Sequence, residues 1–148
     1  GRKRTWDNAI TLGNHVMFPR PLKTDVATVD GGDLIDISWL MHELTHAWQF
    51  QQVGWRYLYE TLSVQIKMGM ECYNYQGQHP SKAKAVREAC ERKHDIDHFN
   101  LEQQGDFARD YYYALRMNTE HDAWEPLIQS FRAKHNPLTR RKRTADAA

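Results

Sequence analysis

The sequence predicts an α+β fold that is mostly helical, with a small β element near the N-terminus. Apolar residues recur at helical spacing along most of the chain. Two short apolar and β-branched segments flank Gly13 and Asn14, a pair that is typical of a turn between strands. With 148 residues, five Trp and seven Tyr, the chain has the size and apolar content of one domain with its own core.

Basic residues gather at both ends of the chain and set the expected domain limits. We expect a basic arm over residues 1–7, a single domain over residues 8–135 and a basic, disordered tail over residues 136–148. The formal net charge of +1 gives no argument for nucleic-acid binding. The sequence has no apolar run long enough to span a membrane and no signal-peptide pattern. It begins with Gly rather than Met, so it can be part of a longer protein.

The first element is expected over residues 8–19, NAITLGNHVMFP, as a strand pair or a kinked strand with its turn at Gly13 and Asn14. A further short strand is expected over residues 24–29. The segment near His15 and Val16 would border any cleft that binds a peptide by strand addition.

A central helix is expected from Asp33 to Gly54, with Asp33 or Asp36 as its N-terminal cap. The glycine stands where a helix C-terminus favours one. The apolar residues of this helix share one face, which we expect to pack in the core: Leu34, Ile37, Met41, Leu44 and Trp48.

The central helix carries the sequence HELTH, an HExxH motif. His42 and His46 are four residues apart on a face separate from the apolar stripe, so their imidazoles can converge on one metal ion. Gln49 lies on the same face. Glu43 projects from the neighbouring flank, where its carboxylate can act as a general base rather than a ligand. The motif therefore predicts a metal site with hydrolytic chemistry.

A second helix is expected over residues 55–70, where apolar residues at helical spacing should pack against the central helix: Leu58, Leu62, Ile66 and Met70. Glu60 on this helix is one alternative metal ligand, although an ion-paired surface glutamate is the plainer interpretation. Residues 71–79 are expected to form a loop, and residues 81–92 a short, largely exposed helix.

The stretch from His94 to His98 contains two histidines and two aspartates. Its alternating spacing suits a connecting loop and a helix cap, and metal ligation by either histidine is the alternative. Cys72 and Cys90 lack the spacing of a zinc site, which leaves open either buried thiols or one disulfide.

A helix over residues 99–117 supplies two carboxylates, and a last helix follows over residues 121–134. Glu102 and Asp106 are four apart on one flank, so one can complete the metal ligands while the other accepts the free N–H of a ligating imidazole. Gly105 is small and permits close approach to a neighbour, as does Ala108. The alternative is an exposed acidic flank with arginine partners, Arg109 and Arg116.

HELTH followed by a Glu-x-x-x-Asp pair on a later helix resembles the zincin metallopeptidases of the gluzincin, thermolysin-like pattern. The resemblance implies a zincin-like fold with an active-site helix and a second, ligand-bearing helix. It implies one zinc ion bound by His42, His46 and Glu102. It also implies that Glu43 is the catalytic base and that Asp106 supports a ligating histidine.

The metzincin pattern HExxHxxGxxH does not fit, because Gln49 and Gln52 stand where that family has Gly and His. The sequence HELTHAWQ is instead similar to small HExxHxxQ domains found beside VgrG, Rhs and other contractile-injection or polymorphic-toxin components of bacteria. The likeness covers residues 8 to 118. The sequence leaves the localisation unknown; the likeness offers the bacterial cytoplasm with export through an injection system as one option, and a secretion-system protein or a cognate immunity protein as partner.

The function expected from these residues is zinc-dependent hydrolysis of a peptide or protein substrate. Donors for the oxyanion are needed, and the sequence offers several without choosing among them: Tyr113, Tyr112, Arg109 and His15. The alternative is a non-catalytic, zinc-stabilised docking or delivery module, in which His98 or Asp97 would fill the fourth position on the metal. A helical adaptor without a metal would require the motif to be a coincidence.

Overall fold

The computed structural model describes residues 9–23 and 31–135, and it is mostly helical with one small two-stranded sheet. This confirms the expected α+β class at that level. The elements in order are β1 (Ile10–Leu12), β2 (His15–Met17), α1 (Gly31–Val53), α2 (Arg56–Met68), the 3₁₀ helix η1 (Gly69–Tyr73), α3 (Lys82–Glu91), η2 (Ile96–His98), α4 (Leu101–Arg116), η3 (His121–Ala123) and α5 (Glu125–His135). The strand expected over residues 24–29, the basic arm and the basic tail lie outside the described residues.

The chain divides into two compact units. Among the described residues, the first unit contains those up to Asn74 together with Asn100–Thr119, and the second contains Tyr75–Phe99 and those from Glu120 onward. The single domain expected over residues 8–135 stays a prediction. In the part of the chain that the structure describes, no helix combines the length and apolar character needed to cross a bilayer.

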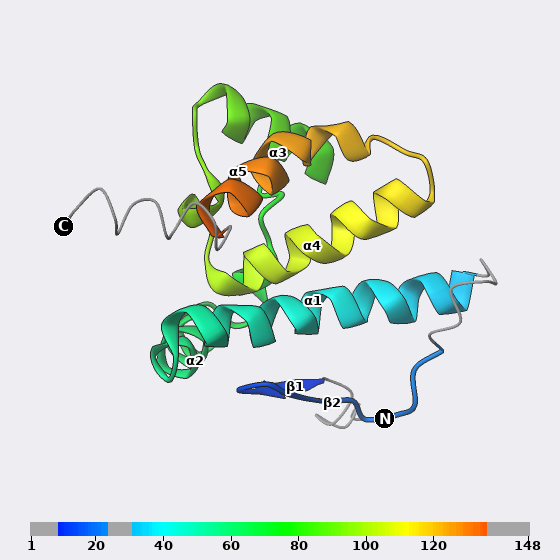
Figure 1. Cartoon of the computed structure of the whole chain (residues 1–148). Coiled ribbons are helices and arrows are strands. Elements are labelled where there is room, and N and C mark those ends of the chain that lie inside the picture. The colour runs from blue at the N-terminus through cyan, green and yellow to red at the C-terminus, as the bar shows by residue number, and fades with distance from the viewer. Residues whose placement is uncertain (1–8, 24–30, 136–148) are drawn as a thin grey trace. The chain divides into compact units, whose positions relative to one another are not determined.

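In the first unit, α1 lies between the β1–β2 hairpin and α4 (Figure 1). The hairpin is antiparallel, with Leu12 paired to His15 across the predicted turn. Gly13 has a positive φ of 64°, which a residue with a side chain adopts rarely. The ring of Phe50 on α1 stands 3.4 Å from the place that a Cβ on Gly13 would occupy, so the turn sits directly on the helix.

The central helix begins at Gly31, earlier than predicted, and Asp36 does not cap it. The carboxylate of Asp36 is buried and accepts hydrogen bonds from the Arg20 guanidinium and from the backbone N–H of Lys23. Asp36 therefore attaches the segment after the hairpin to α1. The helix ends at Val53, and Gly54 follows with φ of 64°.

The prediction that α1 buries one apolar stripe is wrong. Leu34 is buried, but Leu44 is 46% exposed. Apart from Ala47, the buried residues of the motif region are polar: His42, Glu43, His46 and Gln49. The reason is that α4 packs on one side of α1 while β1 packs on another, so the face that carries the motif is enclosed within the unit.

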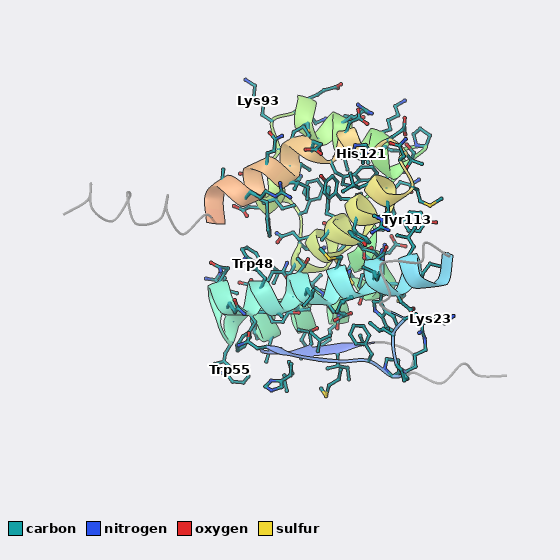
Figure 2. The ribbon with its side chains drawn as sticks, turned by 45° about the vertical axis from the view of Figure 1, so that its right-hand side comes forward. Lys23, Trp48, Trp55, Lys93, Tyr113 and His121 are labelled. Carbon is teal, nitrogen blue, oxygen red and sulfur yellow. The ribbon has the colours of Figure 1, made fainter. Side chains whose placement is uncertain are left out.

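The predicted contact face of α2 is also wrong. Leu62, Ile66 and Met70 are 58%, 75% and 80% exposed, whereas Tyr57 and Thr61 are buried. The ring of Tyr57 lies 5.6 Å from that of His46, so α2 turns this residue toward α1. Trp55, at the start of the helix, is 72% exposed and projects outward (Figure 2).

Helix α4 begins with a capping box, in which the Asn100 side chain accepts from the backbone of Gln103 and the Gln103 side chain accepts from the backbone of Asn100. The Asn100 amide also donates to the Cys72 carbonyl at 3.0 Å, which joins the helix start to η1. Gly105 allows the close approach predicted for it. A Cβ there would stand 2.9 Å from two atoms of the His42 ring.

The second unit contains the residues of the alternative histidine site. The rings of His94 and His98 stack with centroids 3.6 Å apart. Its core includes the indole of Trp124, which donates to the Tyr75 hydroxyl at 3.3 Å.

Cys72 and Cys90 are both free thiols. Of the two alternatives, thiols or one disulfide, the structure therefore shows the thiols.

Candidate metal centre and its cleft

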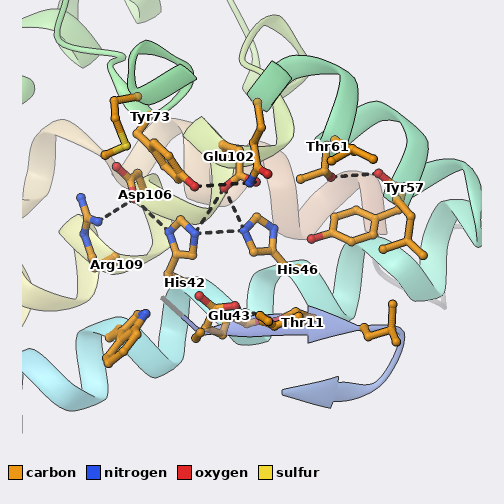
Figure 3. A pocket seen from close by; sticks show the side chains of 18 residues that line it. Thr11, His42, Glu43, His46, Tyr57, Thr61, Tyr73, Glu102, Asp106 and Arg109 are labelled. Carbon is orange, nitrogen blue, oxygen red and sulfur yellow. Dashed lines mark hydrogen bonds and ion pairs between the residues drawn. The ribbon is translucent and has the colours of Figure 1, made fainter. Parts of the chain in front are cut away.

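Two helices bring to one point three side chains that could bind a metal ion. His42 and His46 come from α1, and Glu102 comes from α4 (Figure 3). The two Nε2 atoms are 2.9 Å apart, and Glu102 Oε2 lies 3.2 Å from His46 Nε2 and 3.6 Å from His42 Nε2. All three residues are buried. Among residues 9–23 and 31–135 this is the one group of three with such convergence.

These distances suit a small tetrahedral ion. A zinc ion takes nitrogen and oxygen ligands at about 2.0–2.2 Å in tetrahedral geometry, which separates neighbouring ligand atoms by about 3.4 Å. The separations of 2.9, 3.2 and 3.6 Å lie on both sides of that value. The residues present therefore fit a zinc ion, to which they would supply three ligands.

The charges of the group also favour a bound cation. Burial lowers the pKa of His42, but its ion pairs with Asp106 and Glu102 outweigh burial and raise this pKa to about 9. Burial raises the pKa of Glu102, but the adjacent imidazoles of His42 and His46 outweigh burial and lower this pKa to about 2. Without a metal the centre holds a proton on His42 among carboxylates, and a cation can replace that proton.

Asp106 supports His42 from the side opposite the metal position. Its Oδ1 lies 2.9 Å from His42 Nδ1 and 2.7 Å from an Arg109 guanidinium nitrogen. A carboxylate at Nδ1 keeps the hydrogen on that nitrogen and leaves the Nε2 lone pair for a metal. The structure thus places Asp106 where the resemblance expects it.

Gln49 plays the matching part for His46. Its amide nitrogen donates to the Leu101 carbonyl at 3.1 Å and to the Gln104 side-chain oxygen at 3.0 Å. Both neighbours are acceptors, so the amide oxygen must face the other way, toward His46 Nδ1 at 2.9 Å. His46 therefore carries its hydrogen on Nδ1, and its Nε2 lone pair points into the centre.

Glu43 lies beside the metal group and is held by a strand residue. The Thr11 hydroxyl on β1 donates to Glu43 Oε2 at 2.6 Å. Glu43 is 6% exposed, and Figure 3 shows it on the β1 side of the two imidazoles. Its carboxylate does not belong to the converging ligand group. This arrangement matches the expected position of a general base next to a metal.

The centre forms the floor of a cavity of about 640 Å³, a size typical of ligand sites. Strand β1, helix α2 and η1 provide its apolar walls: Ile10, Leu12, Leu58, Leu62 and Met70. The polar lining also includes Thr61, Gln65 and the hydroxyl-bearing rings of Tyr57 and Tyr73. The cleft therefore combines apolar walls with the buried polar residues of the candidate metal group.

Of the four oxyanion donors expected from the sequence, one lines the cavity and three do not. Arg109 lines the cavity, but its guanidinium pairs with Asp106 and Asp110. The cavity lining does not include His15, Tyr112 or Tyr113. Two phenols that were not among the expected candidates, those of Tyr57 and Tyr73, also line it.

The alternative ligands lie outside the metal group. Glu60 pairs with Arg56 one turn earlier on α2, which agrees with the plainer interpretation of it. His94, Asp97 and His98 belong to the second unit. The metal group therefore contains the three residues predicted from the motif and the downstream carboxylate.

Several polar residues of the site were not predicted from the sequence. The spacing places Gln49 on the face of the two histidines, three residues after His46, but it does not predict the contact with His46 Nδ1. Thr11, Gln65 and Tyr73 reach the site from β1, α2 and η1, and no local pattern marks them.

Comparisons of the chain with protein families, curated proteins and solved structures find no match.

Proposed function

We propose that this chain is a zinc-dependent peptidase with a zincin-like site. The observation that supports it most is the convergence of His42, His46 and Glu102 at the floor of a cleft, with Glu43 beside them but outside the ligand group. A purely structural metal site would have all of its positions filled by protein groups. Here three protein ligands and an adjacent carboxylate suit hydrolysis.

In the proposed reaction, a zinc ion bound by the three ligands would supply Lewis acidity and an activated water. Glu43 accepts a proton from the attacking water and then delivers it to the leaving amine. The hydrogen bond from Thr11 fixes the carboxylate of Glu43 during both transfers. Asp106 and Gln49 keep the hydrogens of the two imidazoles on Nδ1 throughout.

The oxyanion donor in this proposal is a phenol, Tyr57 or Tyr73. Both line the cavity, and Figure 3 shows the Tyr57 hydroxyl directed toward the His46 side of the cleft. Burial raises the pKa of each phenol above its ordinary value, with a further contribution from the Glu102 charge. Both hydroxyls therefore keep their protons at neutral pH and can donate to a developing negative charge.

The walls of the cleft indicate the substrate. Ile10 and Leu12 are 53% and 48% exposed on β1, and Leu62 and Met70 face them from α2 and η1 as further exposed apolar lining. A polypeptide with bulky apolar side chains near the scissile bond would cover these surfaces. We propose such a segment as the substrate, with a secretion-system or immunity protein as the partner that the sequence resemblance implies.

The non-catalytic docking alternative shares the metal group and needs His98 or Asp97 as a fourth ligand. Neither residue belongs to the group of three that converges in the first unit. The peptidase proposal therefore stands as the function that the geometry supports best.

Zinc content and cleavage of a fluorogenic peptide library test the proposal in four variants. We expect Glu43→Gln to retain near-stoichiometric zinc and to lose about 100-fold or more in kcat, because an amide cannot act as a base. His46→Ala and Glu102→Ala should lose the zinc. Glu60→Gln is the matched control, since it changes a glutamate that is paired on the α2 surface. Full cleavage by zinc-loaded Glu43→Gln would contradict the mechanism.

A further inference from the structure

Gln65 on α2 has no role in the proposed reaction as described so far, yet it contacts two residues of the site. Its amide nitrogen donates to Glu102 Oε1 at 2.8 Å and to the Tyr73 hydroxyl oxygen at 3.3 Å. It lines the cleft and is half-buried. One amide group thus connects the third metal ligand with a candidate oxyanion donor.

The orientation of this amide follows from its neighbours. A carboxylate oxygen accepts hydrogen bonds, and Glu102 Oε1 lies 2.8 Å from the amide of Gln65, so the amide turns its nitrogen toward Glu102. An amide nitrogen has two hydrogens, and the two contacts use both of them. The oxygen of Gln65 therefore points away from the metal group.

The contact between Gln65 and Glu102 gives the two carboxylate oxygens of Glu102 different partners. Oε1 accepts from Gln65, while Oε2 faces the imidazoles at 3.2 and 3.6 Å. A carboxylate that is free to rotate can offer both oxygens to a metal and occupy an additional position. With Oε1 held, Glu102 presents a single oxygen and the position next to it stays available.

The contact with Tyr73 determines the direction of its hydroxyl. Gln65 donates to the phenol oxygen, so the hydrogen of that phenol is left to donate elsewhere. Tyr73 lines the same cleft as the metal group. Its hydroxyl can thus serve as a donor toward the reacting carbonyl.

We propose that Gln65 is a positioning residue that holds Glu102 as a single-oxygen ligand and turns the Tyr73 hydroxyl into a donor. The first part concerns metal binding alone. The second part rests on the proposed peptidase function, because it concerns the oxyanion.

Gln65→Met tests the first part. Methionine has nearly the same volume, and the site is half-buried, so the fold should persist; circular dichroism checks this. We expect zinc affinity, measured by competition with a chelator, to fall roughly tenfold. The d–d absorption of the Co²⁺-loaded protein should also change, because a freed Glu102 alters the coordination number. Gln51→Met is the matched control, since it removes an amide that donates to Asn14 at 3.0 Å on the surface.

Tyr73→Phe separates the two parts. It keeps the bond between Gln65 and Glu102, so its zinc affinity and Co²⁺ spectrum should match those of the wild type. In peptide cleavage, Gln65→Met should lower kcat by a smaller factor in the Tyr73→Phe background than in the wild type, because the phenol donor is already gone.

The results that overturn the proposal are distinct from those that overturn the function. A Gln65→Met protein with wild-type zinc affinity and an unchanged Co²⁺ spectrum contradicts the positioning of Glu102. Equal factors in both backgrounds contradict the positioning of Tyr73. A wild-type protein that binds zinc but cleaves no peptide contradicts the peptidase function, and the metal measurements still test the positioning of Glu102. A wild-type protein that binds no metal contradicts both the peptidase function and the positioning of Glu102.

Discussion

Gly105 shows how one absent side chain creates room for a metal ligand. In Gly105→Ala the new Cβ would stand 2.9 Å from the His42 ring, so the ring must shift away from its place beside Glu102. We expect zinc affinity, measured by chelator competition, to fall at least about tenfold. Helical content should not fall, because alanine favours a helix interior by about 1 kcal/mol over glycine. Unchanged zinc affinity would show that the ring is not confined by α4.

Thr11 is the residue that orients the proposed base. Thr11→Val keeps the shape of the side chain and removes the 2.6 Å hydrogen bond to Glu43. We expect zinc content to stay constant and kcat to fall about tenfold, which corresponds to the loss of one hydrogen bond to a charged group.

The matched control for Thr11 is Thr45→Val. The hydroxyl of Thr45 bonds to the Met41 carbonyl within α1, so its loss should leave kcat close to that of the wild type. Equal kcat values in both variants would mean that Glu43 is held by its own packing.

At the scale of elements, Asp36 holds the segment after the hairpin to α1. Its bonds with Arg20 and Lys23 lower its pKa from 3.8 to about 2, with the Arg20 bond as the largest cause and burial as an opposing effect. A lowered folded-state pKa means that this stabilisation is complete above pH 4 and disappears as the pH falls toward 2. The contact therefore stabilises the fold at neutral pH.

Asp36→Asn should lower the free energy of unfolding at pH 7 by about 1–2 kcal/mol, a modest value because Arg20 is half exposed. The difference from the wild type should shrink between pH 4 and pH 2, as measured by urea unfolding. Asp122→Asn is the control, because its ion-paired carboxylate is 65% exposed and should contribute little. A difference that is constant across this pH range would exclude the ion pair as its source.

Helices α1 and α2 show that the spacing of apolar residues does not determine which face of a helix is buried. An apolar stripe predicts a buried face on the assumption that a helix packs on one side. Helix α1 is covered by α4 and by β1, so its polar face is buried as well. Helix α2 leaves Leu62 and Ile66 exposed because Tyr57 and Thr61 make its contacts. Periodicity located both helices and could not show which face each one buries.

Two exposed residues of α2 allow a controlled test of whether the apolar walls of the cleft select the substrate. Leu62 and Ile66 are one turn apart and both exposed, but Leu62 lines the cleft and Ile66 does not. If the walls select apolar side chains, Leu62→Ser should reduce the ratio of kcat/KM for a leucine-rich peptide over a serine-rich peptide by roughly tenfold. Ile66→Ser should leave this ratio unchanged. A similar loss in both variants would attribute the effect to α2 as a whole.

At the scale of the whole molecule, the sequence could predict what one helix or one short pattern determines. His42, Glu43 and His46 follow from spacing within α1, and Glu102 with Asp106 follows from a pair on α4. Thr11 and Gln65 could not be predicted, because their contacts join segments 32 and 37 residues apart. The boundary between the two units was not visible either, since residues 75–99 carry no linker composition.

The interruption of the first unit at Asn74 has a consequence for how the site is assembled. His46 and Glu102 are 56 residues apart, and residues 75–99 lie between them. An ion held by both would act as a removable cross-link that closes this long loop and restricts the unfolded chain, as a disulfide does. The metal ion of the proposed reaction would then also join the two sequence segments of the first unit, which are residues up to Asn74 and Asn100–Thr119. The ribosome synthesises these segments at different times, with residues 75–99 between them.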